Sequence, residues 1–201
     1  MKRGILFVVS GPSGVGKGTV MKEVFKLTTG LYFSVSATTR QPRVGEKNGV
    51  NYHYITEEEF DRMVLNGEML EYIEKFTNRY GTPKHAVEKI LNEGKDVILE
   101  IETIGAKNVK ELMPECIRIF ILPPSLSELK SRLSGRKTET KQQEELRFNT
   151  SFEEINCAYD FDYVVVNNEV EKCAKEIVNI IIAERCKTSR NKDIIDNILK
   201  N

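Results

Sequence analysis

Residues 8–20 read VVSGPSGVGKGTV, with three glycines, a lysine and a Gly-Thr pair packed into the nine residues 11–19. The apolar run over residues 4–10 predicts a strand buried on both faces. After the loop, Val20, Val24 and Leu27 follow at helical spacing. A strand, a glycine-rich loop and a helix together open a βαβ unit, so this stretch predicts an α/β fold.

The loop itself, Gly11 to Lys17, fits the pattern G-x-x-x-x-G-K of phosphate-binding loops. In such loops backbone N–H groups and the N-terminus of the next helix surround the phosphates, and the lysine reaches the β/γ oxygens. The pattern usually ends in Ser or Thr for magnesium, whereas here Gly18 intervenes and Thr19 follows. Triphosphate binding is therefore predicted, and a glycine-rich turn without a ligand is the alternative.

Strands and helices alternate through the rest of the chain. Apolar runs predict further strands at residues 96–101, 117–122 and 162–167, and an amphipathic pattern predicts a last helix over 171–186. The result is a mainly parallel sheet covered by helices on both faces. Two stretches differ. Residues 36–82 suit an inserted subdomain with short strands, and the charged residues 134–149 suit a mobile segment that runs into a helix.

Several helix starts are marked by capping residues. Thr56 and Ser125 each precede a glutamate by three residues, which is the capping-box pattern. Thr82 before Pro83 predicts an N-cap followed by a proline at the first helical position, and Gly94 is expected to close that helix.

Bulk properties exclude several classes of protein. The 30 basic residues balance the 30 acidic ones, so the overall charge favours neither nucleic acid nor an anionic membrane as a partner. The apolar run near the N-terminus is too short for a signal peptide or a membrane span, which predicts a cytoplasmic protein. The cysteines are too scattered for a zinc site or a disulfide framework: Cys116, Cys157, Cys173 and Cys186.

A second anion site is suggested by residues 33–54. Arg40 and Arg43 flank Pro42 on a short loop, where a pair of guanidinium groups suits a bidentate grip on phosphate. Tyr52 and Tyr80 carry hydroxyl groups that can complete such a grip. A solvated or packing role is the alternative for any one of these residues.

With these motifs in place, the chain resembles the guanylate kinases, close to bacterial ones, from about residue 3 to about residue 190. Five separated stretches carry the resemblance: GPSGVGKGT, SVSATTRQPRVGEKNG, EYIEKFTNRYGTP, VILEIETIGA and SGRKTET. The resemblance implies a single P-loop NTPase domain over residues 1–201. Its expected parts are a core (1–35, 93–133 and 150–201), a small mixed-β GMP-binding insert (36–92) and a mobile lid (134–149).

The resemblance also implies the two substrate sites. The expected ATP-binding residues are Gly11, Pro12, Ser13, Gly14, Val15, Gly16, Lys17, Gly18, Thr19, Arg132 and Arg136. The expected GMP-binding residues are Ser36, Arg40, Arg43, Tyr52, Glu71, Tyr80, Thr82 and Glu102. The expected catalytic residues, which stabilise charge during transfer, are Lys17, Arg40, Arg136 and Arg147. Adenine is expected near Asn167.

Glu71 would read the guanine edge, because one carboxylate can accept from both N1–H and the N2 amino group. AMP lacks the N1–H donor, so a site built around this pair would discriminate strongly against it. Ser36 and Thr82 would supply hydroxyl contacts.

Glu100 and Glu102 end the stretch DVILEIE (96–102), which reads as a strand, and residues two apart in a strand can face one cleft. Glu100, with Thr19, would sit near Mg²⁺ or its waters, and Glu102 near the guanine amino group. Many family members carry Asp at both places. Similarly, Lys137 stands where the family's lid usually has Gly.

The expected reaction is ATP + GMP = ADP + GDP, with Mg²⁺ as cofactor, in purine nucleotide metabolism and GMP recycling. The expected partners are ATP and GMP, with dGMP as a further acceptor, and the chain is expected to be a monomer or a homodimer. No role is assigned to His53 or His85, because phosphoryl transfer to an ionised phosphate needs no general base.

Three alternatives have different discriminating features. Scaffold proteins use this fold as a peptide-binding module, but such modules usually have a broken phosphate loop and adjoining domains. Another nucleoside monophosphate kinase would lack the guanine-reading Glu71. A GTPase switch would carry an N-K-x-D guanine motif, which the sequence lacks.

Overall fold

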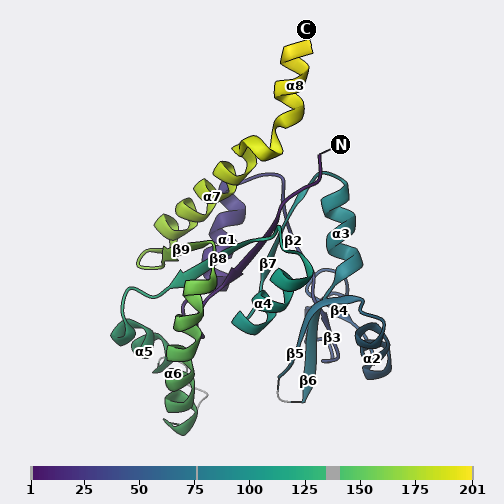
Figure 1. The fold of residues 1–201 in the computed structure, drawn as a ribbon. Helices are drawn as coiled ribbons and strands as arrows, with labels where there is room; N and C mark the ends of the chain where they lie inside the picture. Colours follow the sequence, from purple (N-terminus) through teal and green to yellow (C-terminus); the bar gives the residue numbers. More distant parts are fainter. Residues whose placement is uncertain (1, 76, 135–140, 201) are drawn as a thin grey trace. The chain divides into compact units, whose positions relative to one another are not determined.

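The computed structural model describes residues 2–75, 77–134 and 141–200, and the chain forms two compact units (Figure 1). The first unit comprises Arg3–Ser10 and Gly30–Arg118, and the second comprises Gly11–Thr29 and Ile119–Asn201. The strand that precedes the glycine-rich loop thus belongs to the first unit, and the loop itself belongs to the second.

Three parallel strands form the centre of the first unit: β1 (Leu6–Ser10), β2 (Leu31–Phe33) and β7 (Asp96–Glu100), in the order β2-β7-β1. All of β1 is buried, as its apolar run predicts. Ser10 and Asp96 are buried polar residues of these strands, and the Asp96 carboxylate accepts the backbone N–H of Ile5 at 2.7 Å. Helix α3 (Lys84–Asn92) packs against β7, and α4 (Thr103–Leu112) packs against β1.

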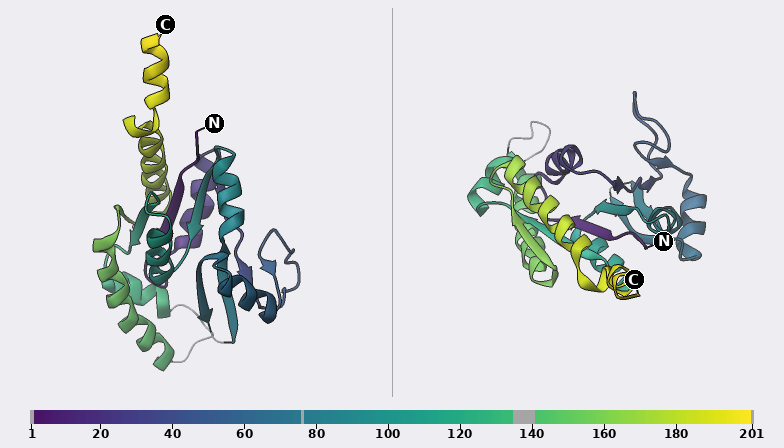
Figure 2. Two further views of the ribbon diagram at one scale, coloured as in Figure 1. Left: turned by 45° about the vertical axis from the view of Figure 1, so that its right-hand side comes forward. Right: turned by 90° about the horizontal axis from the view of Figure 1, so that it is seen from above.

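A separate mixed sheet completes the first unit. Its strands are β3 (Ala37–Thr38), β4 (His53–Tyr54), β5 (Met69–Lys75) and β6 (Asn78–Pro83), in the order β4-β3-β6-β5. Helix α2 (Glu57–Leu65) buries Phe60 against Ala37 and Met69. The Thr56 hydroxyl caps α2 by accepting the Glu59 N–H at 3.1 Å, as predicted. The segment between β3 and β4 extends from this sheet as a long loop (Figure 2).

The predicted start of α3 is wrong by one position. Strand β6 continues through Pro83, and the helix begins at Lys84 with Pro83 as its N-cap. Thr82 pairs with Glu71 in the β5–β6 ladder, and its hydroxyl donates to the Glu71 carboxylate at 2.6 Å. This contact holds Thr82 in the strand and gives its side chain a partner other than the helix. Gly94 follows the helix with φ +78°, as predicted.

The second unit contains the parallel pair β8 (Ile117–Leu122) and β9 (Tyr163–Val166). Its helices are α1 (Lys17–Leu27), α5 (Leu126–Ser134), α6 (Lys141–Asn156), α7 (Val170–Cys186) and α8 (Lys192–Lys200), with short 3₁₀ turns η1 (Cys157–Asp160) and η2 (Thr188–Arg190). Helices α1 and α7 pack together through buried residues such as Val24 and Ile177. The Ser125 hydroxyl caps α5 by accepting the Glu128 N–H at 3.1 Å.

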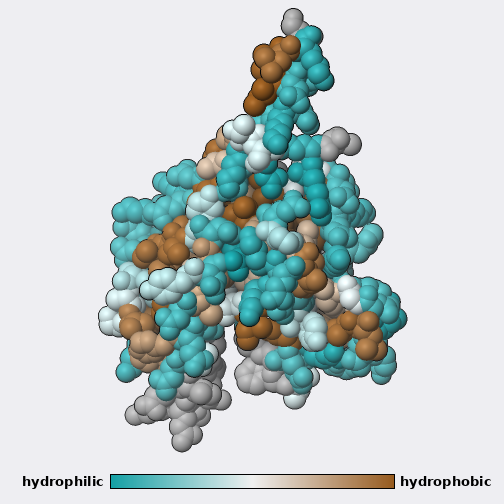
Figure 3. Space-filling model, in the orientation of Figure 1, coloured by the Kyte–Doolittle hydropathy of each residue, from teal (hydrophilic) through white to brown (hydrophobic). Residues whose placement is uncertain are grey.

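Helix α8 differs from the others, because its apolar side chains remain exposed. They form a band along the helix (Figure 3) that consists of Ile194, Ile195, Ile198 and Leu199. Within the described ranges of the chain, no helix is both long enough and apolar enough to cross a membrane.

Candidate functional site

The glycine-rich loop takes a conformation that its glycines alone permit. Gly14 and Gly16 have φ values of +83° and +95°, where side chains other than hydrogen are strained. A Cβ atom at Gly14 would lie 2.7 Å from Leu133, and one at Gly16 would lie 2.8 Å from Asn167. At both positions glycine avoids backbone strain and leaves room for the neighbouring side chain, as expected for a phosphate loop.

Two side chains from other elements hold the loop through the carbonyl of Val15. Asn167, after β9, donates from Nδ2 to this oxygen at 2.7 Å. Arg132, on α5, donates to it from Nη1 at 3.3 Å and to the Asn167 carbonyl from Nη2 at 3.2 Å. Arg132 is a predicted nucleotide contact, and here its guanidinium group lies against the loop backbone.

The side chains of Lys17 and Glu154 form hydrogen bonds with backbone groups of the loop. Lys17 Nζ donates to the carbonyl of Gly11 at 2.6 Å and to that of Pro12 at 3.3 Å. The Ser13 N–H donates to the Glu154 carboxylate, on α6, at 3.0 Å. The loop thus already presents an N–H group to an anionic oxygen. Glu154 was not predicted as a site residue, because a glutamate within a charged helical stretch carries no distinguishing signal.

In the first unit, Glu71 is a buried carboxylate on β5. The residue is 6% exposed, and Oε1 accepts the Thr82 hydroxyl at 2.6 Å. Burial raises the pKa of Glu71 and the negative charge of Glu102 raises it further, while the Thr82 hydrogen bond opposes the shift. A partly satisfied carboxylate held in this way can accept hydrogen bonds from a ligand that carries N–H donors.

Glu100 and Glu102 do not both end the strand, contrary to expectation. Strand β7 stops at Glu100, and Glu102 is the N-cap of α4, whose backbone carbonyl accepts the Ala106 N–H at 2.9 Å. The carbonyl of a residue that caps a helix begins the helical ladder, so it no longer takes part in the sheet, and here the strand ends two residues before the cap. The charge of Glu102 nevertheless acts on Glu71.

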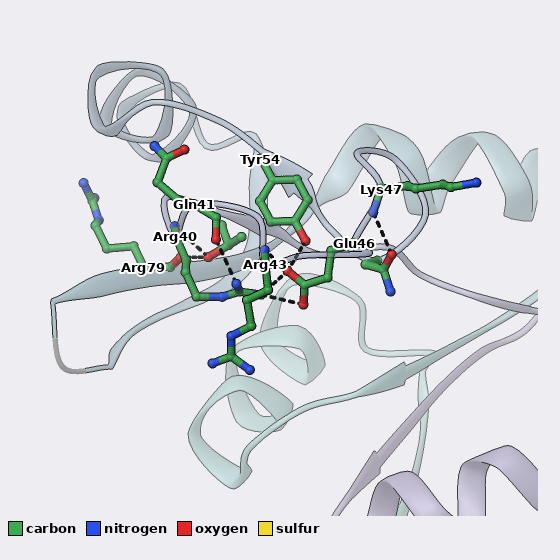
Figure 4. A network of polar contacts seen from close by, with 9 residues as sticks. Arg40, Gln41, Arg43, Glu46, Lys47, Tyr54 and Arg79 are labelled. Atoms are coloured by element: carbon green, nitrogen blue, oxygen red, sulfur yellow. Dashed lines mark hydrogen bonds and ion pairs between the residues drawn. The ribbon is translucent and has the colours of Figure 1, made fainter.

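Arg40 lies in a network centred on Glu46 (Figure 4). Its Nη2 is 3.0 Å from each Glu46 oxygen, and Nη1 donates to the Gln41 carbonyl at 2.8 Å. Glu46 also accepts the Arg43 backbone N–H at 2.7 Å and the Tyr54 hydroxyl at 2.8 Å. These contacts, the Arg43 N–H first, then Tyr54 and Arg40, lower the pKa of Glu46 to about 2. Neither Glu46 nor Tyr54 was predicted, because sequence spacing does not show that the loop folds back on itself.

Three predicted residues meet around this network. The Tyr52 ring packs edge-on against Tyr80, with centroids 5.9 Å apart, and Arg40 lies 5.5 Å from the Tyr52 centroid. By contrast, the Arg43 side chain is exposed and extends away from Glu46 (Figure 4). Ser36 accepts the His53 N–H at 2.8 Å through its backbone carbonyl.

The remaining predicted residues are placed as follows. Thr19 is exposed in the first turn of α1. Arg136 and Lys137 lie outside the described residues, and Arg147 belongs to α6 with its side chain outside the described part. In the part of the chain that the structure describes, no three His, Cys, Asp or Glu side chains cluster in a way that could hold a metal ion.

Comparisons with known proteins agree on one family. The family model described as guanylate kinase matches residues 3–184. The guanylate kinase of Clostridioides difficile (strain 630) is 53% identical over 195 residues, which cover 97% of this chain and 95% of that protein. That of Bacillus anthracis is 50% identical, covering 94% and 93%. The crystal structure of guanylate kinase from Anaplasma phagocytophilum matches with a TM-score of 0.74 at 36% identity, covering 94% of this chain and 90% of that one. The predicted α/β P-loop fold is thereby confirmed.

Proposed function

The chain belongs to the guanylate kinase family and is a kinase that phosphorylates GMP, and we propose that ATP is its phosphoryl donor, with ADP and GDP as products. The single observation that supports the acceptor assignment best is the buried Glu71 carboxylate. It accepts a hydrogen bond from Thr82, and the negative charge of Glu102 acts on it. We also propose that this reaction takes place in the cytoplasm and serves to recycle GMP.

The acceptor residues all belong to the first unit. Glu71 would accept from guanine N1–H and from the N2 amino group, and Glu102 would also approach this amino group. The Thr82 and Ser36 hydroxyls would complete the contacts to the base. At the other end of GMP, the phosphate would bind Arg40, Arg43, Tyr52 and Tyr80. Because Glu46 holds Arg40 in place through two oxygens, the guanidinium group is positioned before the phosphate arrives.

The donor residues belong to the second unit. The loop N–H groups and the N-terminus of α1 would surround the ATP phosphates, and Lys17 would leave the carbonyls of Gly11 and Pro12 to reach the β/γ oxygens. Arg132, Arg136 and Arg147 would neutralise the charge that spreads over the transferred group. Catalysis would then consist of alignment and charge stabilisation, without a covalent enzyme intermediate.

Magnesium fits the donor set that the chain offers. The Thr19 hydroxyl and the Glu100 carboxylate are hard oxygen ligands, and Mg²⁺ usually retains several waters and binds through one or two protein oxygens plus the nucleotide phosphates. When bound, it would neutralise phosphate charge. A site of this kind does not need a cluster of acidic residues.

An ADP-release assay with ATP and Mg²⁺ tests this function. GMP, dGMP, AMP, CMP and UMP are offered in turn, and we expect kcat/KM for GMP to exceed that for AMP by about 100-fold or more, because the site is built around hydrogen bonds that AMP cannot complete. A preference for AMP or a pyrimidine nucleotide would show that the acceptor residues are misassigned. ATP binding without turnover on any acceptor would instead favour the peptide-binding module.

Glu154 provides a prediction for the donor residues. Glu154→Ala removes the acceptor of the Ser13 N–H, so the loop loses a contact that shapes it before ATP binds. We expect KM for ATP to rise about fivefold, equivalent to the net loss of one hydrogen bond of about 1 kcal/mol, with KM for GMP unchanged.

Glu154→Gln is the matched control, because its amide oxygen can still accept the Ser13 N–H. Steady-state titrations of ATP and of GMP should place this variant close to the wild-type enzyme. If both variants lower KM for ATP, then Glu154 competes with the nucleotide phosphates for the loop and does not organise it.

A further inference from the structure

We propose that Gly105 sets the acceptor specificity of this enzyme. Because glycine has no side chain, the Glu71 carboxylate can lie against the helix at this position. Gly105 lies in the first turn of α4, and it was not among the predicted site residues. Glu71 lies on β5, which packs against α4. The proposal rests on the proposed function, because it concerns how Glu71 is held for reading guanine.

The geometry is specific to Glu71. A Cβ atom added to Gly105 would lie 2.9 Å from Glu71 Oε2, 3.3 Å from Cδ and 3.3 Å from Cγ. All three nearest atoms thus belong to the same side chain. Two restraints therefore act on one carboxylate: the Thr82 hydroxyl binds Oε1 at 2.6 Å, and Oε2 lies against the bare helix at Gly105.

Local backbone structure does not explain a glycine at this position. Gly105 is helical and buried, and it is absent from the glycines that have positive φ. Alanine is favoured over glycine at such a position, since glycine loses more conformational entropy when a helix forms. A glycine that weakens its helix without any need for an unusual φ indicates a packing constraint. The carboxylate of Glu71 is the group that supplies it.

A methyl group at Gly105 would displace this carboxylate. Glu71 can move away from it by rotating its own side chain, which would lengthen the Thr82 contact and shift the oxygens that face guanine. Sites that recognise a ligand through paired hydrogen bonds tolerate about 0.5 Å of such displacement. The helix itself can accept the methyl group, so the expected damage falls on GMP recognition and leaves the fold intact.

The test is a double-mutant cycle between Gly105→Ala and Glu71→Ala, with kcat/KM for GMP measured by ADP release. Gly105→Ala alone should lower this value by about tenfold or more through KM for GMP, with KM for ATP and kcat near the wild-type values. In the Glu71→Ala background the same substitution should change kcat/KM by less than about twofold, because no carboxylate remains to be displaced. Thermal unfolding of each variant checks the fold.

The outcomes separate the two assignments. If Glu71→Ala leaves GMP turnover intact, the role of Glu71 fails and the proposal fails with it. If Glu71→Ala weakens GMP but Gly105→Ala does not, only the role of Gly105 is overturned. Should Gly105→Ala fail to fold, the double variant should fold again, since the clash has been removed. A double variant that also fails to fold would show that the methyl group meets something other than Glu71.

Discussion

Glu71→Gln is expected to lower kcat/KM for GMP by about 100-fold, because one of the two charge-assisted hydrogen bonds proposed between Glu71 and guanine would become a contact between two donors. Glutamine keeps the size of the side chain and an acceptor for Thr82, but its amide nitrogen cannot accept from N1–H or from the amino group. The rate with AMP should change little, so the preference for GMP over AMP should fall by a similar factor.

The same substitution should not destabilise the protein. Burial raises the pKa of Glu71 above its ordinary value of 4.5, so the folded state disfavours its charged form. The resulting loss of folding stability is absent below the pKa that Glu71 has in the unfolded chain. It is fully present once the pH exceeds the raised pKa that Glu71 has in the folded chain. At neutral pH, glutamine removes the buried charge, and the melting temperature of Glu71→Gln should equal or exceed that of the wild type.

The raised pKa of Glu71 also predicts a pH dependence. As the pH falls through this pKa, Glu71 gains a proton and loses an acceptor for guanine, so KM for GMP should rise at acid pH. The glutamine variant has no such group and should lack this limb of the profile. Titrations of GMP across the acid range, at saturating ATP, would contradict the assignment if both enzymes gave the same curve.

Local features were predicted best from the sequence where a single physical requirement, such as a positive φ value or a helix cap, selects one type of residue. Gly14 and Gly16 have the positive φ values that a phosphate loop requires, and Thr56 and Ser125 cap their helices as their spacing indicates. Such features depend on a few neighbouring residues and need no knowledge of the tertiary fold. The start of α3 was misplaced because a tertiary partner, Glu71, decides what Thr82 does.

The supporting residues could not be predicted in the same way. Glu46, Glu154 and Gly105 act through contacts with groups 3 to 141 residues away in the chain. Glu46 and Gly105 lie within stretches that carry the family resemblance, but the sequence does not show which groups they contact. Asn167 shows the same limit: it was expected near adenine, and its hydrogen bond to the carbonyl of Val15 could not be foreseen from the sequence. Sequence patterns predict the groups that would bind a ligand, whereas the contacts that hold these groups in place arise only from the tertiary fold.

Lys17→Met is the second change for which we expect a large effect, a loss of kcat of about 1000-fold. The lysine would stand at the β/γ oxygens of ATP, where negative charge grows and shifts during transfer. Removing one well-placed donor from such a site costs about 100- to 1000-fold in comparable systems, and here a full positive charge is lost with it. Methionine keeps most of the length and apolar volume of the side chain, so packing changes little.

Lys17 also stabilises the loop itself, through the carbonyls of Gly11 and Pro12. Lys17 Nζ binds both of them, at 2.6 and 3.3 Å, so the substitution also removes a contact within the loop. The loss should therefore appear in KM for ATP as well as in kcat, while KM for GMP stays near the wild-type value. Lys17→Arg should not restore the rate, because the planar guanidinium group is larger and cannot replace a compact ammonium in a narrow loop.

Lys26→Met is the matched control, since Lys26 lies on the same helix with its side chain 71% exposed and contacts Glu23. It should retain wild-type kcat and KM values in the ADP-release assay. Equal, small losses in the two methionine variants would show that Lys17 only maintains the helix. A loss confined to Lys17→Met, with its melting temperature unchanged, would place the positive charge at the transferred phosphate, because a purely structural role would lower stability together with rate.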